Sequence, residues 1–390
     1  MIKRALFEAI VKSLAEYPVI SITGPRQSGK TTLCRTTLPN YTYFNLERID
    51  NREMVLSDPI GFLNRYTKNG LILDEAQRAP ELFSYIQSYV DDHKSMGKII
   101  LTGSQNFLLS NAISQSLAGR VKNFRLLPFS YFELSHLKSF TSISTDKMLF
   151  DGLYPPIYDR SVSPSDWYGN YIETYLERDV RTLKNISDLH LFQKFIGLCA
   201  GRIGQLLNFS SLASDLGVSS HTVKNWLGVL EANYIIILLQ PHHNNLNKRI
   251  TKQPKLYFLD TGLACALAHI NSADTLSRHY LRGSIYENYA ICEYLKFRFN
   301  QGLSSNLYFW RDHHGNEVDM VIDNGKLNAL EIKSGETFHS DMLKGLRYWQ
   351  KSTNTPKKNT ALLFGGNETR YSGEAEILTL SQLNSWFNTL

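Results

Sequence analysis

The residues with the clearest chemistry form a short glycine-rich run near the N-terminus. Residues 24–31 read Gly-Pro-Arg-Gln-Ser-Gly-Lys-Thr and match the pattern GxxxxGK[ST] at every fixed position. The run follows an apolar stretch and opens a helical pattern, so backbone N–H groups and a helix N-terminus can surround phosphate oxygens. Lys30 can reach the β- and γ-phosphates of ATP, and the Thr31 hydroxyl can ligate Mg²⁺. The expected nucleotide-binding residues are Gly24, Pro25, Arg26, Gln27, Ser28, Gly29, Lys30, Thr31 and Thr32.

An acidic pair supplies the second half of such a site. Asp74 and Glu75 end the apolar run Leu-Ile-Leu at residues 71–73. Asp74 can hold Mg²⁺, and Glu75 can orient or deprotonate the attacking water. The alternative is that Asp74 only caps a helix start. Having both carboxylates favours ATP hydrolysis over binding alone.

Two further positions could contact the γ-phosphate. Ser104 follows an apolar strand pattern and is our choice for a sensor, with Thr102 and Gln105 as alternatives. A polar turn is the simpler interpretation of this segment. Arg120 could neutralise transition-state charge in cis or from a neighbouring subunit of a homo-oligomer, or it could be an ordinary surface arginine.

Near the C-terminus, carboxylates and a lysine recur in the order Glu287, Asp319, Glu331, Lys333. This order resembles the PD-(D/E)xK nuclease core. Alternation predicts that Glu331 and Lys333 project from one strand face, where Asp319 and Glu331 could share a metal and Glu287 could complete its shell. Lys333 would position a water or stabilise charge. The alternatives are a fold kept for binding, and a solvent-facing strand edge at residues 317–319.

His313 and His314 precede these strands and are candidate metal ligands. A polar hairpin turn is the favoured interpretation of the two histidines.

The middle of the chain has the form of a helix-turn-helix. Residues 212–227 predict a helix, a glycine turn and a second helix capped by Ser219. Two strands at 234–240 and 255–259 would then form a wing. In a DNA-binding winged helix, the residues facing a groove would be Ser220, His221, Lys224 and Asn225. The residues near the tip of the wing would be Lys248, Arg249, Lys252 and Lys255. Winged helices also serve as lids and protein-contact modules.

Strands that alternate with helices must position the first site. Strand patterns at 18–23, 41–46, 70–73, 98–101 and 121–126 alternate with helical ones, which favours a mostly parallel sheet covered on both faces. The predicted class is α/β: a P-loop sheet at 1–135, a junction at 136–165, a helical and winged-helix segment at 166–275, and a smaller nuclease-like α/β domain at 276–390.

Several of these runs resemble one family when taken together. Residues 24–32, 73–77, 101–105 and 116–120 are similar to prokaryotic AAA-type ATPases that carry a C-terminal domain of unknown function with a restriction-endonuclease-like core. The resemblance extends over nearly the whole chain. It implies ATP binding, ATP hydrolysis and an unassigned physiological role.

Composition narrows the class of protein to which the chain could belong. The 390 residues are 43% hydrophobic and 20% charged, which is typical of a globular protein, and the net charge of +6 permits contact with nucleic acid without requiring it. The four cysteines are scattered, which predicts neither a disulfide framework nor a zinc site. No signal peptide or membrane span is expected, so we predict a cytoplasmic protein.

We therefore predict a magnesium-dependent ATPase coupled to DNA binding, with DNA cleavage as a further prospect. The alternative is an ATP-switched regulatory or interaction protein whose second half binds partners without catalysis.

Overall fold

The structure is a computed structural model that describes residues 2–104, 116–176, 188–242, 253–366 and 370–390. Its contacts divide the chain into two units, which we describe separately. The first unit contains residues 1–129, 232–234 and 298–304, and the second contains residues 130–231, 235–297 and 305–390.

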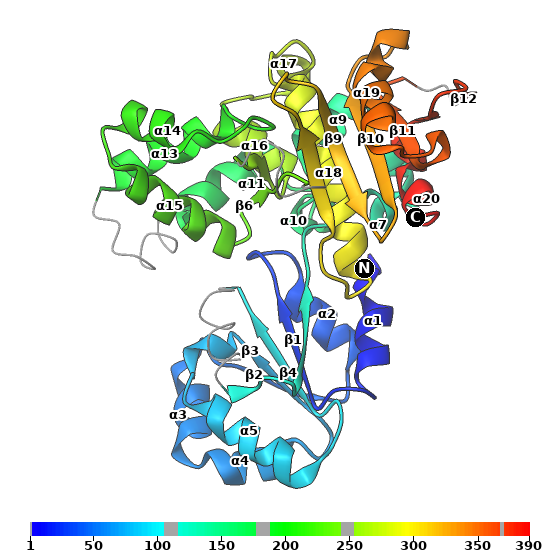
Figure 1. The fold of residues 1–390 in the computed structure, drawn as a ribbon. Helices are drawn as coiled ribbons and strands as arrows, with labels where there is room; N and C mark the ends of the chain where they lie inside the picture. Colours follow the sequence, from blue (N-terminus) through cyan, green and yellow to red (C-terminus); the bar gives the residue numbers. More distant parts are fainter. Residues whose placement is uncertain (1, 105–115, 177–187, 243–252, 367–369) are drawn as a thin grey trace. The chain divides into compact units, whose positions relative to one another are not determined.

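A five-stranded parallel sheet forms the centre of the first unit (Figure 1). Its strand order is β2-β3-β4-β1-β5, so β4 lies between β1 and β3. The sequence predicts all five strands to within about two residues, because each is a short apolar or β-branched run. The strands are β1 (Val19–Thr23), β2 (Thr42–Asn45), β3 (Leu71–Asp74), β4 (Ile99–Gly103) and β5 (Val121–Arg125).

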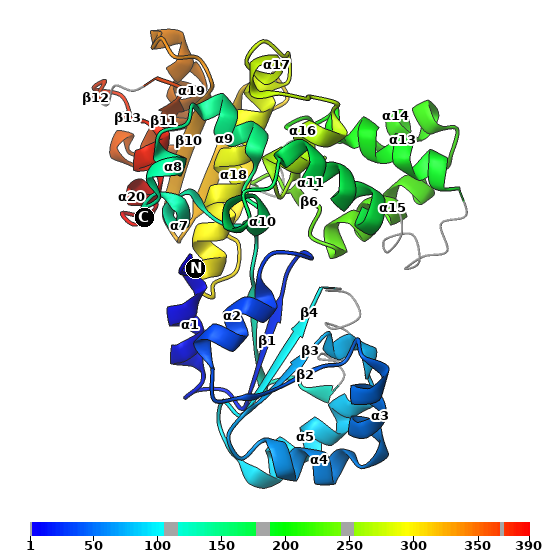
Figure 2. The same cartoon turned by 180° about the vertical axis from the view of Figure 1, so that it is seen from behind.

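Helices cover both faces of this sheet (Figures 1 and 2). One buried cluster joins α1 and α2 to the strands through residues such as Leu6 and Leu33. A second cluster joins α3, α4 and α5 to the opposite face through Val55, Phe62 and Ile86. The helices are α1 (Leu6–Ser13), α2 (Lys30–Thr37), α3 (Ile49–Ser57), α4 (Pro59–Tyr66), the 3-10 turn η1 (Ala76–Arg78) and α5 (Leu82–His93).

Short helices open the second unit. Residues 136–165, which the sequence suggests as a junction, contain three of them, and their side chains Leu149, Leu153 and Tyr154 are buried. The elements are α7 (Tyr131–Leu134), α8 (Lys138–Thr141), α9 (Thr145–Asp151), α10 (Pro155–Asp159), α11 (Pro164–Tyr171) and the π-helical turn η2 (Ile172–Leu176).

The middle region is helical and ends in a two-stranded hairpin. α13 (Leu189–Ala200) precedes α14 (Phe209–Leu216), which stops at Gly217 with φ +68°, a left-handed conformation that suits glycine. The Ser219 hydroxyl then accepts the Thr222 amide at 3.0 Å and caps α15 (Ser220–Ala232), as predicted. β6 (Ile236–Leu239) and β7 (Lys255–Phe258) pair antiparallel.

A mixed six-stranded sheet forms the C-terminal part, with the order β12-β13-β11-β10-β9-β8. β9 is antiparallel to its two neighbours, β8 and β10, whereas β10, β11 and β13 are parallel. α19 packs on β9 and β10 through Leu346 and Trp349, and α18 runs beside the same strands (Figure 1).

These C-terminal elements and the helices before them have the following bounds: α16 (Thr261–Leu267), α17 (Ala273–Ser277), α18 (Arg282–Asn300), β8 (Leu307–Arg311), β9 (Glu317–Asp323), β10 (Leu327–Lys333), η3 (Ser340–Leu343), α19 (Lys344–Thr353), η4 (Lys357–Asn359), β11 (Thr360–Phe364), β12 (Arg370–Tyr371), β13 (Glu376–Leu378), η5 (Leu380–Gln382) and α20 (Leu383–Phe387). Within the described residues, no helix combines the length and apolar character needed to cross a membrane.

Candidate functional site

The glycine-rich run lies between β1 and α2, where a parallel strand ends and a helix begins. Gly24 has φ +155°, and a Cβ there would collide with the carbonyl oxygen of Leu126. Gln27 and Gly29 also have positive φ, at +63° and +91°. A non-glycine residue in this region is strained, and such strain concentrates at ligand-binding loops.

Lys30 is folded back over the loop that precedes it. Its ammonium donates to the carbonyl oxygens of Gly24 at 3.0 Å and Pro25 at 2.8 Å, and the residue is only 6% exposed. Burial lowers the pKa of Lys30 to about 8, although Glu75 and Asp74 act in the opposite direction. Both partners are neutral carbonyls, so phosphate oxygens could replace them with stronger charge-assisted bonds.

Asp74 is the best-connected carboxylate of this site. Its Oδ2 accepts the Thr31 hydroxyl at 2.7 Å and the Tyr43 hydroxyl at 2.7 Å. Its Oδ1 accepts the Glu75 amide at 3.2 Å and the Thr102 hydroxyl. The Thr31 hydroxyl donates this hydrogen bond to Asp74, so the lone pairs of the Thr31 oxygen stay available to a metal. Thr102, an alternative sensor in the sequence, therefore anchors Asp74.

Glu75 follows β3 in a left-handed conformation, with φ +54°. Its Oε2 accepts Gln77 Nε2 at 2.6 Å and the Ser104 hydroxyl at 3.1 Å. Ser104 reaches Glu75 because β4 lies between β1 and β3, which brings the carboxyl ends of all three strands to one edge. Gln105 lies outside the described residues.

The oxygen atoms of Ser28, Thr31 and Asp74 suit the binding of Mg²⁺ and a phosphate ligand. The Ser28 side chain is fully buried, and its hydroxyl has no hydrogen-bond partner among the described residues. Buried polar atoms normally have a partner, so this one is available to a ligand. Together with the Thr31 hydroxyl and the Asp74 carboxylate, it supplies the oxygen donors that Mg²⁺ and its bound phosphates need.

The structure does not bring Arg120 to this site. Arg120 precedes β5 at the amino end of the sheet, where its carbonyl accepts the Val19 amide, whereas the phosphate loop lies at the carboxyl end. The two ends are separated by a strand length, roughly 15 Å. The guanidinium pairs with both oxygens of Asp91, at 2.6 and 2.8 Å. A cis role at the phosphates is thus not supported.

Three residues that support the loop were not identified from the sequence. Arg4 donates to the carbonyl oxygens of Ser28 at 2.8 Å and Leu127 at 2.7 Å. Tyr43 contacts Asp74, as described above. Tyr234, at φ +58°, shares a 2.6 Å hydrogen bond with the hydroxyl of Thr23, the residue before the loop. All three contacts join segments far apart in the chain, and no local sequence motif predicts them.

The C-terminal carboxylates also lie together, on adjacent strands and α18. The β9–β10 register ends at Leu330 opposite Met320, and its continuation sets Glu331 opposite Asp319. Lys333 approaches Glu331 Oε1 at 2.6 Å and Asp319 Oδ2 at 3.6 Å, so alternation correctly placed it with Glu331. Among the described residues, however, no three acidic, histidine or cysteine side chains are arranged to hold a metal ion.

Lys255 explains this arrangement and corrects the expectation that it lies at a wing tip. It is the first residue of β7, and its side chain is 2% exposed. Its ammonium contacts Glu287 Oε1 at 2.9 Å, Glu317 Oε1, and Asp319 Oδ1 at 3.9 Å. Glu317 is therefore no solvent-facing strand edge but a partner of Lys255. Lys248, Arg249 and Lys252 lie outside the described residues.

Burial and mutual repulsion perturb these carboxylates. Burial raises the pKa of Glu331 to about 8, with the nearby Asp319 charge adding to the effect and Lys333 opposing it. Burial likewise raises the pKa of Glu287, against the influence of Lys255. Burial alone would depress the pKa of Lys255, but the surrounding acidic groups raise it well above its ordinary value. This direction favours the charged form of Lys255.

The four residues expected to face DNA open α15. His221 and Lys224 are exposed, while Ser220 and Asn225 are half-buried. The Asn225 amide lies 3.2 Å from His221 Nδ1, and the Lys224 ammonium lies 5.2 Å from the Phe209 ring. Only one of the four is a permanent cation, so this surface is weakly charged for contact with phosphates.

His313 and His314 lie in the turn between antiparallel strands β8 and β9, as the favoured interpretation predicts. Their rings are exposed and their centroids are 3.8 Å apart. The backbone of this turn is held by Asp312, whose Oδ1 accepts the His314 amide at 2.9 Å.

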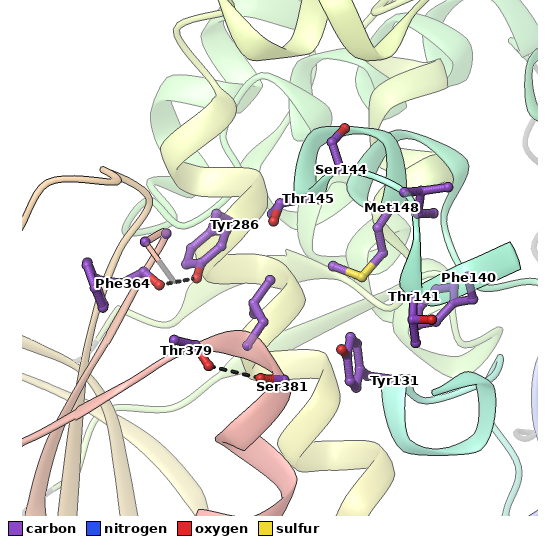
Figure 3. A pocket seen from close by; sticks show the side chains of 14 residues that line it. Tyr131, Phe140, Thr141, Ser144, Thr145, Met148, Tyr286, Phe364, Thr379 and Ser381 are labelled. Carbon is purple, nitrogen blue, oxygen red and sulfur yellow. Dashed lines mark hydrogen bonds between the residues drawn. The ribbon is translucent and has the colours of Figure 1, made fainter. Parts of the chain in front are cut away.

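A cavity of about 230 Å³ lies elsewhere in the second unit (Figure 3). The Tyr286 hydroxyl donates to the Phe364 carbonyl oxygen at 2.9 Å on one wall, and the Thr379 and Ser381 hydroxyls are 3.0 Å apart on another. None of the lining residues is charged. The cavity therefore lacks the cations expected of a phosphate site.

Comparisons with known proteins match three domain models to successive parts of the chain. Residues 16–135 match the model of an AAA domain, while residues 143–274 and 282–383 match two domains of unknown function, DUF8612 and DUF4143. Among solved structures, the Walker-type ATPase paby2304 of Pyrococcus abyssi is 16% identical with a TM-score of 0.48, covering 68% of this chain and 96% of that one.

Two relatives match at least 80% of this chain, and the match covers nearly three quarters of each relative. The uncharacterized protein MJ1544 of Methanocaldococcus jannaschii is 24% identical over 345 residues, which cover 80% of this chain and 73% of the relative. The uncharacterized protein Rv2008c of Mycobacterium tuberculosis is 32% identical over 334 residues, or 84% of this chain and 72% of the relative. The chain therefore belongs to the same protein family as Rv2008c, and in it a nucleotide-binding AAA domain is followed by two domains of unknown function.

Proposed function

We propose that this protein hydrolyses ATP with the help of Mg²⁺ at the loop between β1 and α2. The observation that carries the proposal is the hydrogen bond from Thr31 to Asp74, with Glu75 next in sequence. This arrangement supports the proposal, because it brings to one edge of the sheet a hydroxyl and two carboxylates that could hold Mg²⁺ and orient a water.

The expected roles follow from the contacts. Lys30 and the amides of residues 24–31 would bind the β- and γ-phosphates. Thr31 and Asp74 would hold Mg²⁺, which neutralises charge on the phosphate oxygens when bound. Glu75 would accept a proton from the water that attacks the γ-phosphorus, while the bond from that phosphorus to the ADP oxygen breaks. Ser104 and Gln77 would keep the Glu75 carboxylate in place.

Phosphate release by the full chain tests this proposal. Wild-type protein should release phosphate from ATP with Mg²⁺ but not with excess chelator. Asp74→Asn should lower the rate by about 100-fold, because it weakens the charge that holds the metal. Asp92→Asn, an exposed position on α5, is the matched control. A wild-type rate in Asp74→Asn would overturn the proposal, and so would no release by wild type.

For the second half we propose the regulatory alternative in preference to DNA cleavage. Lys255 supports this choice, since it lies among the carboxylates that a nuclease would use for metal. We further propose a winged-helix fold within residues 166–275 and a nuclease-like fold at residues 276–390, after an ATPase domain at 1–135 and a junction at 136–165. A role for Arg120 would require a neighbouring subunit.

DNA contact through α15 is open to a separate test. A duplex should bind the full chain at low salt and dissociate as salt rises, and His221→Ala with Lys224→Ala should weaken it. Lack of retention at low salt would rule out DNA contact and leave the ATPase proposal unaffected.

A further inference from the structure

The ammonium of Lys255 lies among three acidic side chains drawn from two elements. Glu287 comes from α18, while Glu317 and Asp319 come from β9. Lys255 itself comes from β7, and the neighbouring Tyr257 of that strand donates its hydroxyl to Glu287 Oε1. One hairpin thus contributes both a cation and a hydroxyl donor to the centre.

The remaining cations complete a nearly balanced set of charges. Lys333 pairs with Glu331, and the Arg311 guanidinium donates to Glu317 Oε2 at 2.7 Å. Each carboxylate therefore has a lysine or arginine within ion-pair distance. Buried carboxylates need such partners, because an uncompensated buried charge is strongly unfavourable. A divalent cation added to this set would compete with a lysine or arginine for every carboxylate group.

Backbone packs closely against the same carboxylates. A Cβ at Gly345 would lie 2.9 Å from Glu331 Oε2, and one at Gly204 would lie 3.4 Å from Glu287 Oε2. The Ile332 amide also donates to Asp319 Oδ2 at 2.8 Å. Mg²⁺ usually keeps several of its waters, and backbone this close to the carboxylates restricts the room for them.

We propose that Lys255 is the resident cation of this centre, in the place that a divalent metal would otherwise take, and that it pins the β6–β7 hairpin to the C-terminal sheet. The ion pairs of this centre then fasten the hairpin to the sheet and leave no metal site between them. The centre would accept a metal only when the ammonium is removed.

Metal binding to the nucleotide-free chain tests this inference. Lys255→Met keeps an unbranched side chain, shorter by the terminal ammonium, and removes its charge. We expect this variant to have a lower Tm than wild type, to bind one more Mn²⁺ per chain, and to recover Tm when Mn²⁺ is added. Mn²⁺ can be counted by electron paramagnetic resonance, and a second change, Glu287→Gln, should abolish the gain.

Lys296→Met is the matched control. Lys296 is also 2% exposed and pairs with a single buried carboxylate, Glu293, at 3.0 Å. This variant should lose stability without gaining an Mn²⁺ site, because one carboxylate does not make a metal centre.

Two outcomes would overturn the inference: a folded Lys255→Met that gains no Mn²⁺, or a wild-type chain that loses one Mn²⁺ on Glu287→Gln. If Lys255→Met does not fold, the comparison of wild type with Glu287→Gln decides alone. Equal Mn²⁺ counts in those two proteins would then support the inference. Neither outcome depends on ATP hydrolysis, so this inference and the ATPase proposal can fail independently.

Discussion

Each unit of this molecule contains a buried lysine close to acidic residues, but the partners of the two lysines differ. Lys30 donates to two neutral carbonyl oxygens, and burial lowers its pKa to about 8. Lys255 contacts three carboxylates, which raise its pKa well above the ordinary value. A lysine held by neutral groups can exchange them for an anionic ligand. A lysine already neutralised by carboxylates serves the fold.

The comparison predicts opposite consequences for the two lysine sites. Lys30→Ala should weaken ATP binding by at least about 100-fold, because charge-assisted bonds to phosphate are each worth about 1.5–3 kcal/mol. The protein should stay folded, as judged by Tm. Calorimetric titration measures the affinity, with Lys12→Ala on the exposed side of α1 as the control. An unchanged ATP affinity would remove the basis of the comparison.

The carboxylate centre should respond in stability and not in catalysis. Asp319→Ala removes one of the carboxylates that neutralise Lys255 and Lys333, and it leaves the Ile332 amide without its acceptor. The free energy of unfolding should therefore fall by about 3 kcal/mol. The ATPase rate of the folded variant should stay within about twofold of wild type. Denaturant unfolding and phosphate release measure the two effects, and the exposed Asp341→Ala should change neither. A wild-type stability would contradict the structural role.

The lowered pKa of Lys30 gives a proton linkage at the nucleotide site. Near pH 8 about half of the ligand-free chains carry a neutral Lys30. Bound phosphates raise this pKa, so ATP binding at pH 8 should take up about half a proton. The observed binding enthalpy should then vary with the ionisation enthalpy of the buffer. Lys30→Arg, which stays charged, should lose most of this uptake, and equal uptake in both proteins would exclude Lys30 as its source.

A smaller effect is expected at Ser104. Its hydroxyl donates one 3.1 Å bond to Glu75, worth about 0.5–1.5 kcal/mol net. Ser104→Ala should therefore lower kcat by about three- to tenfold with ATP affinity unchanged, whereas the exposed Ser84→Ala on α5 should have no effect. Loss of ATP affinity in Ser104→Ala would instead indicate direct contact with the nucleotide.

The two regions also differ in how far their sequences predict them. The phosphate loop is a contiguous motif, and Asp74 and Glu75 follow an apolar strand, so local patterns identify both. Alternation likewise predicts the common strand face of Glu331 and Lys333. The sequence does not predict the role of Lys255, because its partners lie in α18 and β9 and its neighbours in sequence favour a position near a wing tip. Arg4 and Tyr43 were missed for the same reason, since their contacts depend on tertiary packing.

Glu75→Gln tests the central claim most directly, because it keeps the shape of the side chain and removes its ability to accept a proton. Single-turnover hydrolysis of Mg·ATP should slow by at least about 100-fold, while the Kd for ATP stays close to that of wild type. Hydrolysis at the wild-type rate with intact ATP binding would contradict the account of this site.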